Sequence, residues 1–390
     1  MIKKVFPILA LAMFASMLGV GIVSPFLPLY SQKMGATGIW VGIIFGIFSV
    51  YRVLVMPFTG RLSDRKGRKL FLSIGLVCYA IISVAYIWAS SILHLIIIRL
   101  LHGVASGMIL PIAIASIGEL SPKGEEGKWM GYANAAFFGG FAVGPLLGGM
   151  VADYFGTNTA FLTMASLNML AFLLILFFLT EGNQEGATTV FKLSLKEISA
   201  SRIIRGLFSY RVAYAIGRGT FMTFLAIFGT SILDLSQADV GIVLTTHMVL
   251  VSVSQPYLGH FADKFSRRAM VVIGGSINFM FLALIPVTQS YWQILFLCII
   301  GSFGAAISMP AATAMTVEEG RKGFGMASTM SLLMIAMGIG MAVGPTIAGA
   351  ISDALNINAA FYFASLMSFA GTALFMWFTR RGQQSTPYPK

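Results

Sequence analysis

Acidic residues are scarce in this chain, since 14 of its 390 residues are Asp or Glu while 26 are Lys or Arg. Charged residues of both signs make up 10% of the chain, whereas a soluble domain typically carries about 25%. Hydrophobic residues reach 57%. This composition excludes an ordinary soluble domain and is typical of a polytopic membrane protein.

Cysteine is scarce too, and the common motifs of soluble enzymes do not occur. Cys78 and Cys298 both fall in predicted helices, so a disulfide framework is not indicated. The sequence has no dinucleotide fingerprint, Walker motif, metal-ligand cluster or nucleophile triad. We therefore do not expect an enzyme, a bound cofactor or metal, or a pump that hydrolyses ATP.

Twelve apolar stretches are each long enough to cross a hydrocarbon core about 30 Å thick. Because lipid offers no hydrogen-bond partners, the backbone of each stretch must satisfy its own polar groups, and the stretches are too long for barrel strands. The expected fold is an all-α integral membrane bundle. The expected spans are 5–30, 39–59, 70–90, 93–118, 129–152, 159–180, 206–232, 239–259, 269–289, 291–315, 325–350 and 358–379.

Lysine and arginine are distributed unevenly between alternate loops. With the N-terminus inside, nearly all loop bases lie on the cytoplasmic side, and Lys33 lies outside. Because cytoplasmic loops carry the excess of Lys and Arg, we expect both termini in the cytoplasm and the protein in a bacterial inner membrane. The bases are scattered over short loops, so no nucleic-acid partner is expected.

An internal repeat at an offset of 199 to 200 positions divides the chain in two. It predicts two pseudo-symmetric six-helix bundles, residues 1–180 and 206–390, joined by a cytoplasmic linker, 181–205. Halves related in this way characterise one class of transporter, whose substrate site lies at their interface near mid-bilayer. Matching pairs include Asp64 with Asp263, Arg68 with Arg267, Pro111 with Pro310, Glu119 with Glu318, and Asp153 with Asp353.

The segment Gly60-Arg-Leu-Ser-Asp-Arg-Lys-Gly-Arg-Lys69 lies in an expected loop between the second and third spans, and Gly259–Arg268 is its degenerate copy. It resembles the signature loop of the major facilitator superfamily. The resemblance implies a cytoplasmic latch that holds one conformation, although the bases of the loop also fix topology. The residues expected in the latch are Gly60, Asp64, Arg65, Gly67, Arg68, Glu119, Asp263, Arg267 and Glu318.

Two further motifs resemble elements of the same superfamily. Arg99-Leu-Leu-His-Gly103 is similar to R-x-x-Q-G, with His102 in place of Gln. A second segment matches G-x-x-x-G-P-x-x-G-G, the motif associated with antiporters, whose small residues allow close helix contact. The nearest likeness is the twelve-helix drug/proton antiporter branch, which implies export by antiport. The motif residues are Gly140, Gly144, Pro145, Gly148 and Gly149.

The chain departs from that branch because no acidic residue falls in the membrane core of an expected span, Asp239 lying at the outer edge of its own, while four arginines do. An ionisable group at that depth is costly and often functional, and arginine forms a fork suited to carboxylate or phosphate. Arg211 has an alternative role at the headgroup boundary, and Arg99 has one in architecture. The expected substrate contacts are Arg52, Arg99, His102, Asn134, Tyr214 and Arg218, and the proton-coupling candidates are His102 and His247.

The motifs and the basic path predict a secondary transporter that exports amphiphilic small molecules, such as drugs or metabolites, by proton antiport with alternating access. One alternative is an organic-anion or phosphate-ester transporter or exchanger that uses the arginines. A second alternative is a lipid flippase on the same fold. The expected partners are a small-molecule substrate, protons or another coupling ion, and the lipid bilayer, and we expect a monomer.

Overall fold

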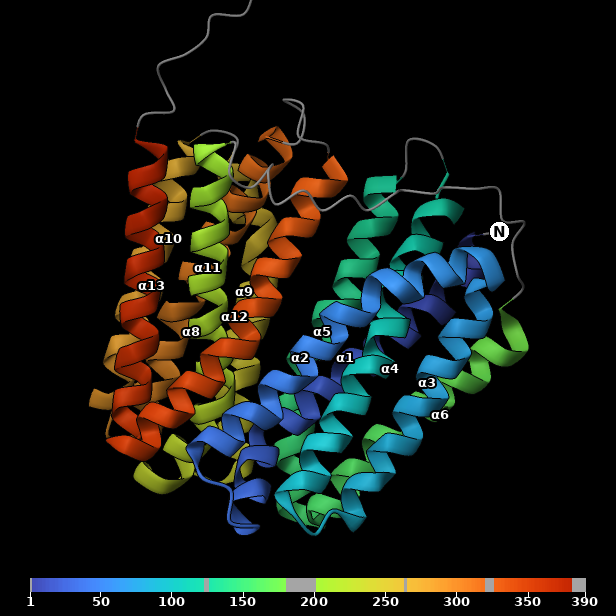
Figure 1. Cartoon of the computed structure of the whole chain (residues 1–390), viewed down its shortest axis with the longest axis horizontal. Coiled ribbons are helices and arrows are strands. Elements are labelled where there is room, and N and C mark those ends of the chain that lie inside the picture. The colour runs from blue at the N-terminus through green and yellow to red at the C-terminus, as the bar shows by residue number, and fades with distance from the viewer. Residues whose placement is uncertain (1, 123–125, 180–200, 263–264, 320–325, 381–390) are drawn as a thin grey trace, which may run out of the picture.

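The computed structural model describes residues 2–122, 126–179, 201–262, 265–319 and 326–380. Within these ranges, twelve membrane-length helices confirm the predicted all-α bundle (Figure 1). Short 3₁₀ turns, Tyr86–Trp88 and Ile285–Val287, extend the third and ninth of them. The helices are α1 Ile2–Lys33, α2 Gly38–Lys66, α3 Arg68–Ala85, α4 Ile92–Leu120, α5 Glu126–Phe155, α6 Thr157–Phe178, α8 Arg202–Ile232, α9 Gln237–Ala262, α10 Arg267–Leu284, α11 Tyr291–Glu319, α12 Met326–Ala354 and α13 Ile357–Thr379.

Most helices extend a few residues beyond the expected spans, and two of these ends bear on the site. The helix α8 begins at Arg202, four residues before the expected span, because the Ser201 hydroxyl accepts a hydrogen bond from the Ile204 amide at 3.3 Å and caps it. The helix α2 continues to Lys66, so most of the expected loop 60–69 is helical. Only Gly67 separates α2 from α3, with a φ of 103° that favours glycine.

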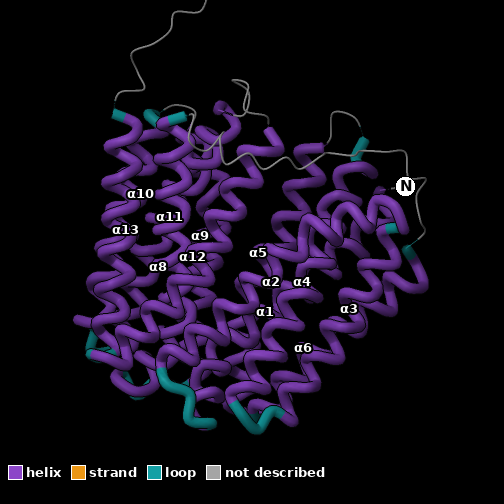
Figure 2. The backbone as a smooth tube through the Cα atoms, in the orientation of Figure 1, coloured by secondary structure: helices purple, strands orange, loops and turns teal. Residues whose placement is uncertain are grey.

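The helices α1 to α6 lie beside α8 to α13 in two groups, here called the first and second halves (Figure 1). The short described loops lie at both ends of the helices (Figure 2). We call the end where α1 starts and α13 finishes the inner end, and the opposite one the outer end. The helix α8 is the most enclosed, with 89% of its most apolar window buried.

Small residues set the packing inside each half. A Cβ added to Gly140 or Gly144 of α5 would meet the backbone of α1. In the second half, a Cβ at Gly344 of α12 would lie 2.7 Å from the Cα of Ile216 on α8. The antiporter motif and its repeat therefore hold α5 against α1 and α12 against α8 at distances that a methyl group would prevent.

The two halves meet at the outer end through α2 with α12 and α5 with α9. The backbone of Gly42 lies against Pro345 of α12, and that of Gly241 lies against Pro145 of α5. Gly349 of α12 also touches the backbone of Gly38 at the start of α2. Every one of these contacts lies in the outer part of its helices, so the halves are closed together there.

Candidate transport path between the two halves

Arg52 on α2 and Arg218 on α8 lie at equal depth in opposite halves. Each is 14 residues from the outer end of its helix, which corresponds to about 21 Å at 1.5 Å per residue. The guanidinium carbon of Arg218 lies 5.2 Å from the ring centroid of Phe141, which belongs to α5 of the first half. Arg218 therefore reaches across the boundary between the halves.

The charge of Arg52 interacts with those of Arg218 and Arg99. Its guanidinium carbon lies 5.6 Å from the ring centroid of Phe48, and its Nε is buried with no hydrogen-bond partner. Such cation–π contacts are worth about 0.5–2 kcal/mol. The ring therefore offsets part of the desolvation of Arg52, and two cations from different halves still face the same region.

Arg99 lies inside the first half instead of at its boundary. It is 3% exposed, and its Nε donates to the Ile44 carbonyl of α2 at 3.2 Å. Its guanidinium carbon is 4.4 Å from the centroid of the Phe48 ring. These contacts tie α4 to α2, which favours the architectural alternative over the predicted substrate contact.

His102 is fully buried between α3 and α4. Its Nε2 is 3.2 Å from the Ser83 hydroxyl and its Nδ1 is 3.2 Å from the Tyr86 hydroxyl. The ring stacks on Tyr79 with centroids 4.2 Å apart. All of these neighbours belong to the first half, so the predicted roles in substrate contact and proton coupling receive no support from this position.

Tyr214 and Arg211 pack inside the second half. Tyr214 is buried, with its ring centroid 6.4 Å from that of Tyr210, and the Arg211 Nη1 contacts the sulfur of Met309 on α11. The repeated spacing along α8 does not, therefore, direct all three predicted side chains to one path. Among these three described side chains, Arg218 is the one whose cation–π contact reaches the opposite half.

His247 and Asn134 occupy more open positions. The Nδ1 of His247 lies 3.1 Å from the Cys298 carbonyl of α11, and its ring stacks on Phe281 with centroids 5.5 Å apart. His247 is partly exposed on α9, a helix of the second half that contacts α5 of the first half. Asn134 is exposed in the inner part of α5.

The described latch residues lie at the inner end, with one ion pair in each half. Asp64 accepts from Arg68 at 3.3 Å, and in the second half Glu318 accepts from Arg267 at 3.2 Å. Arg65 is exposed and Gly60 has open space around it. Asp263 and the side chain of Glu119 lie outside the described part of the chain, so their predicted places in the latch stay predictions.

Two carboxylates at the outer end were not among the predicted site residues. Asp353 of α12 accepts from the amides of Gly38 and Ile39, at 2.5 and 2.9 Å, at the start of α2. Asp153 of α5 accepts from the Ala238 amide of α9 at 2.6 Å. Each carboxylate therefore caps a helix of the opposite half. Their match in the repeat was the signal that pointed to them.

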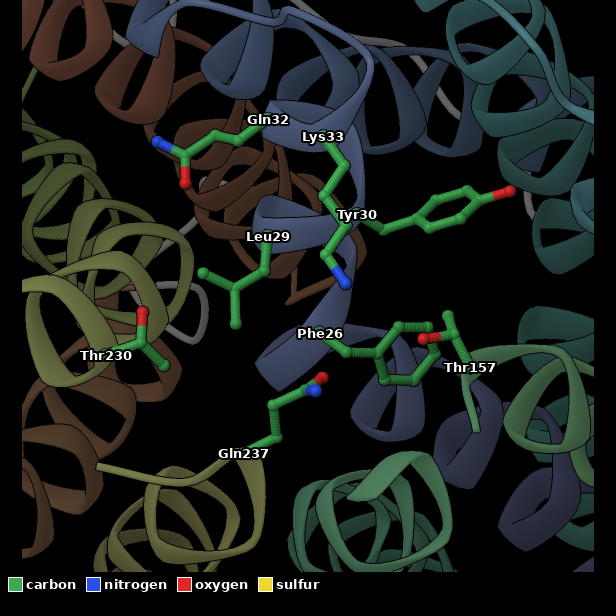
Figure 3. A pocket seen from close by; sticks show the side chains of 8 residues that line it. All are labelled: Phe26, Leu29, Tyr30, Gln32, Lys33, Thr157, Thr230 and Gln237. Carbon is green, nitrogen blue, oxygen red and sulfur yellow. The ribbon is translucent and has the colours of Figure 1, made fainter. Parts of the chain in front are cut away.

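A cavity of about 420 Å³ lies at the outer end between α1 and the second half (Figure 3). Its floor is apolar, and the side chains of Lys33 and Gln237 extend into it in Figure 3. It lies nearer the outer end than Arg52 and Arg218 do, on the closed side of the molecule. The lining residues are Phe26, Leu29, Tyr30, Gln32, Lys33, Thr157, Thr230 and Gln237.

Twelve membrane helices in two repeat-related groups, with charged residues meeting at their boundary, define a transporter of the two-half type. The family model of the Major Facilitator Superfamily matches residues 9–234 and 207–390. The chain therefore belongs to the Major Facilitator Superfamily. It is a multi-pass membrane transporter and not an enzyme, as the sequence predicted.

Curated relatives align over nearly the whole chain. An uncharacterized transporter of the same superfamily from Methanocaldococcus jannaschii is 28% identical over 381 residues, covering 94% of this chain and 95% of that protein. The quinolone resistance protein NorA of Staphylococcus aureus is 27% identical over 383 residues, with 95% of each chain covered.

Solved structures share the fold at low sequence identity. A bacterial homologue of the human lysosomal transporter Spinster, in an inward-facing and occupied conformation, superposes with a TM-score of 0.85 at 14% identity, covering 99% of both chains. The nucleoside transporter NupG gives 0.80 at 15% identity, covering 96% of this chain and 99% of that one.

Proposed function

We propose that this transporter exports amphiphilic small molecules from the cytoplasm by proton antiport with alternating access. The observation that carries the proposal is the position of the antiporter motif. Gly140, Gly144 and Gly148 hold α5 on α1, while Gly149 touches the backbone of Gln237 on α9 of the other half. The motif thus lies where rocking halves must separate. The similarity to the quinolone resistance protein NorA supports drug or metabolite efflux.

The proton carrier in this proposal is His247. Imidazole can carry a proton on either ring nitrogen, and this one is partly exposed on α9, with its Nδ1 3.1 Å from the Cys298 carbonyl. The described acidic residues of the helices all lie in first or last turns. Among the described residues at membrane depth, imidazole is therefore the group best suited to take up and release a proton.

The proposal also includes the bacterial inner membrane, cytoplasmic termini and a monomer. Basic loops and helix ends at the inner end, such as Arg61, Lys66 and Arg380, support this orientation. A latch at the inner end, built around Asp64 and Arg68, would then open and close against the cytoplasm in each cycle.

A proteoliposome panel tests the proposal. Purified protein is reconstituted and uptake of cationic, neutral and anionic amphiphiles is measured with and without an imposed pH gradient. We expect uptake of at least one class to rise when the gradient drives protons in the opposite direction. Uptake that ignores the gradient for every compound would refute proton antiport, and exchange that depends on anions alone would favour the organic-anion alternative.

A further inference from the structure

Positive charges of both halves lie near the boundary between them, with no acidic partner among the described residues near them. Arg52 of the first half and Arg218 of the second half lie at equal depth, about 21 Å from the outer end. The charge of Arg52 interacts with that of Arg218, and Arg99, which lies over the same Phe48 ring as Arg52, adds a third positive charge nearby. The described carboxylates of the neighbouring helices lie in terminal turns, as Asp64 and Asp153 do. The pair is therefore not neutralised by the protein residues described at that depth.

The surroundings of the pair are shaped for a group with both charge and apolar surface. Phe48 lies 5.6 Å from the Arg52 guanidinium and Phe141 lies 5.2 Å from that of Arg218. The buried Nε of Arg52 lacks a hydrogen-bond partner. A buried donor without a partner is costly, so this region has an unused donor as well as unbalanced charge.

We propose that Arg52 and Arg218 form one anion-binding site shared by the two halves, which takes a single carboxylate-like anion between the guanidinium groups. A guanidinium presents paired N–H donors that match the two oxygens of a carboxylate. One anion placed between the arginines neutralises their repulsion and supplies an acceptor for the unpartnered Nε–H of Arg52. Phe141, which lies beside the Arg218 guanidinium, then contacts the apolar part of the same molecule.

This inference deepens the proposed export function by naming the charge class of the cargo. An anion that contacts both halves stabilises their approach at mid-depth, whereas the empty site resists it. The anion has two possible sources, the carboxylate of the transported amphiphile or an inorganic anion of the cytosol. Both satisfy the same guanidinium chemistry, and a binding experiment separates them.

The test measures the thermal unfolding midpoint of the purified full-length transporter in detergent at constant ionic strength, with gluconate as the reference anion. Benzoate is the probe and benzamide is its neutral counterpart. We expect benzoate to raise the midpoint and benzamide to leave it unchanged. If chloride protects as well as benzoate, the source is an inorganic anion, and if only benzoate protects, the source is the cargo carboxylate.

The variants Arg52→Ala and Arg218→Ala should each raise the benzoate concentration needed for half of the shift by at least tenfold, while Arg380→Ala, an exposed arginine at the end of α13, should not change it. In the reference buffer each site variant should be at least as stable as the parent, because it relieves a repulsion; a purely structural arginine would give the opposite result. Where an alanine variant does not fold, Arg52→Gln and Arg218→Gln replace it.

Benzoate protection that survives in both folded site variants, or is lost in only one, would overturn the shared site. These measurements use no membrane gradient, so their failure would leave proton-driven export intact. Conversely, a transporter that binds benzoate through both arginines and ignores pH gradients would keep the site and lose the antiport proposal.

Discussion

Four arginines lie at membrane depth, and their neighbours give them different roles. Arg99 is held by the Ile44 carbonyl and the Phe48 ring inside the first half. Arg211 contacts the sulfur of Met309 inside the second. Arg218 contacts Phe141 of the first half, and Arg52 lies at the same depth on α2. The sequence shows that four cations are inside the membrane, but helix spacing does not say which partner each one finds.

The two candidate histidines should separate in function when each is replaced by glutamine. His102→Gln should lower stability, since it removes the stacking on Tyr79 and part of a buried hydrogen-bond set worth about 1–3 kcal/mol, but it should keep proton-driven uptake. His247→Gln should leave stability nearly unchanged but abolish proton-driven uptake. Thermal unfolding and gradient-driven uptake of both variants provide the measurement, and an uncoupled but fully stable His102→Gln would contradict the assignment.

The latch prediction depends on Asp64. Asp64→Asn removes the negative charge that accepts from Arg68 at 3.3 Å and should reduce transport several-fold while membrane insertion stays normal, because the Lys and Arg residues that set topology are unchanged. Uptake normalised to the amount of inserted protein measures this. Turnover equal to that of the parent would exclude a latch at this position.

At the scale of helices, the interface between the halves depends on glycines, whose lack of a side chain allows close contact. The helices α2 and α12 approach through Gly42 and Pro345, and α5 and α9 approach through Pro145 and Gly241. In these contacts the two backbones touch directly, which small residues at the interface allow. The outer closure is therefore as much a property of glycine positions as of the charged residues around it.

Gly42→Ala and Gly139→Ala form a matched pair. A Cβ at Gly42 would meet the backbone of Pro345 and Thr346, whereas at Gly139 its nearest neighbour is the Phe14 ring at 3.8 Å. Overpacking typically costs about 1–3 kcal/mol, so Gly42→Ala should separate the outer ends of α2 and α12. Spin labels at positions 35 and 355 should report a longer distance in Gly42→Ala and an unchanged one in Gly139→Ala. Equal distances in both variants would contradict the contact.

The sequence predicted the helices well because each had to satisfy its backbone in lipid, and this constraint is local. The sequence predicted less well those features that depend on contacts between helices. The expected loop before Gly67 is helical up to Lys66, and the predicted cavity residue His102 lies buried against α3. Composition and periodicity place a residue on a helix, whereas its partner depends on how that helix is rotated in the bundle.

At the scale of the whole molecule, carboxylates lie at both ends, in the predicted latch at the inner end and as helix caps at the outer end. Asp64 belongs to a pair at the inner end. Asp153 and Asp353 cap helices of the opposite half at the outer end. Since a carboxylate at a helix N-terminus is worth about 0.3–1 kcal/mol from the dipole alone, the outer pair favours the conformation closed on that side.

Asp353→Asn and the double variant Asp153→Asn/Asp353→Asn should shift the population toward conformations open at the outer end, by about two- to fivefold for the single change. The same spin-label pair at positions 35 and 355 measures this shift. Asp234→Asn, in the nearby loop before α9, is the control and should leave the distance distribution unchanged. A distribution that is identical in the parent and the double variant would show that the caps do not hold the closure.

The reciprocal caps have a consequence for how such a chain arises. Asp153 of the first half serves the second, and its repeat counterpart Asp353 serves the first. A single six-helix unit paired with its own copy about a twofold axis would make both bonds with one carboxylate position, in an isologous dimer. Gene fusion of that dimer would preserve both caps from the start. Later divergence could then change the residues deeper in the interface, where Arg52 and Arg218 do not occupy matching positions of the repeat.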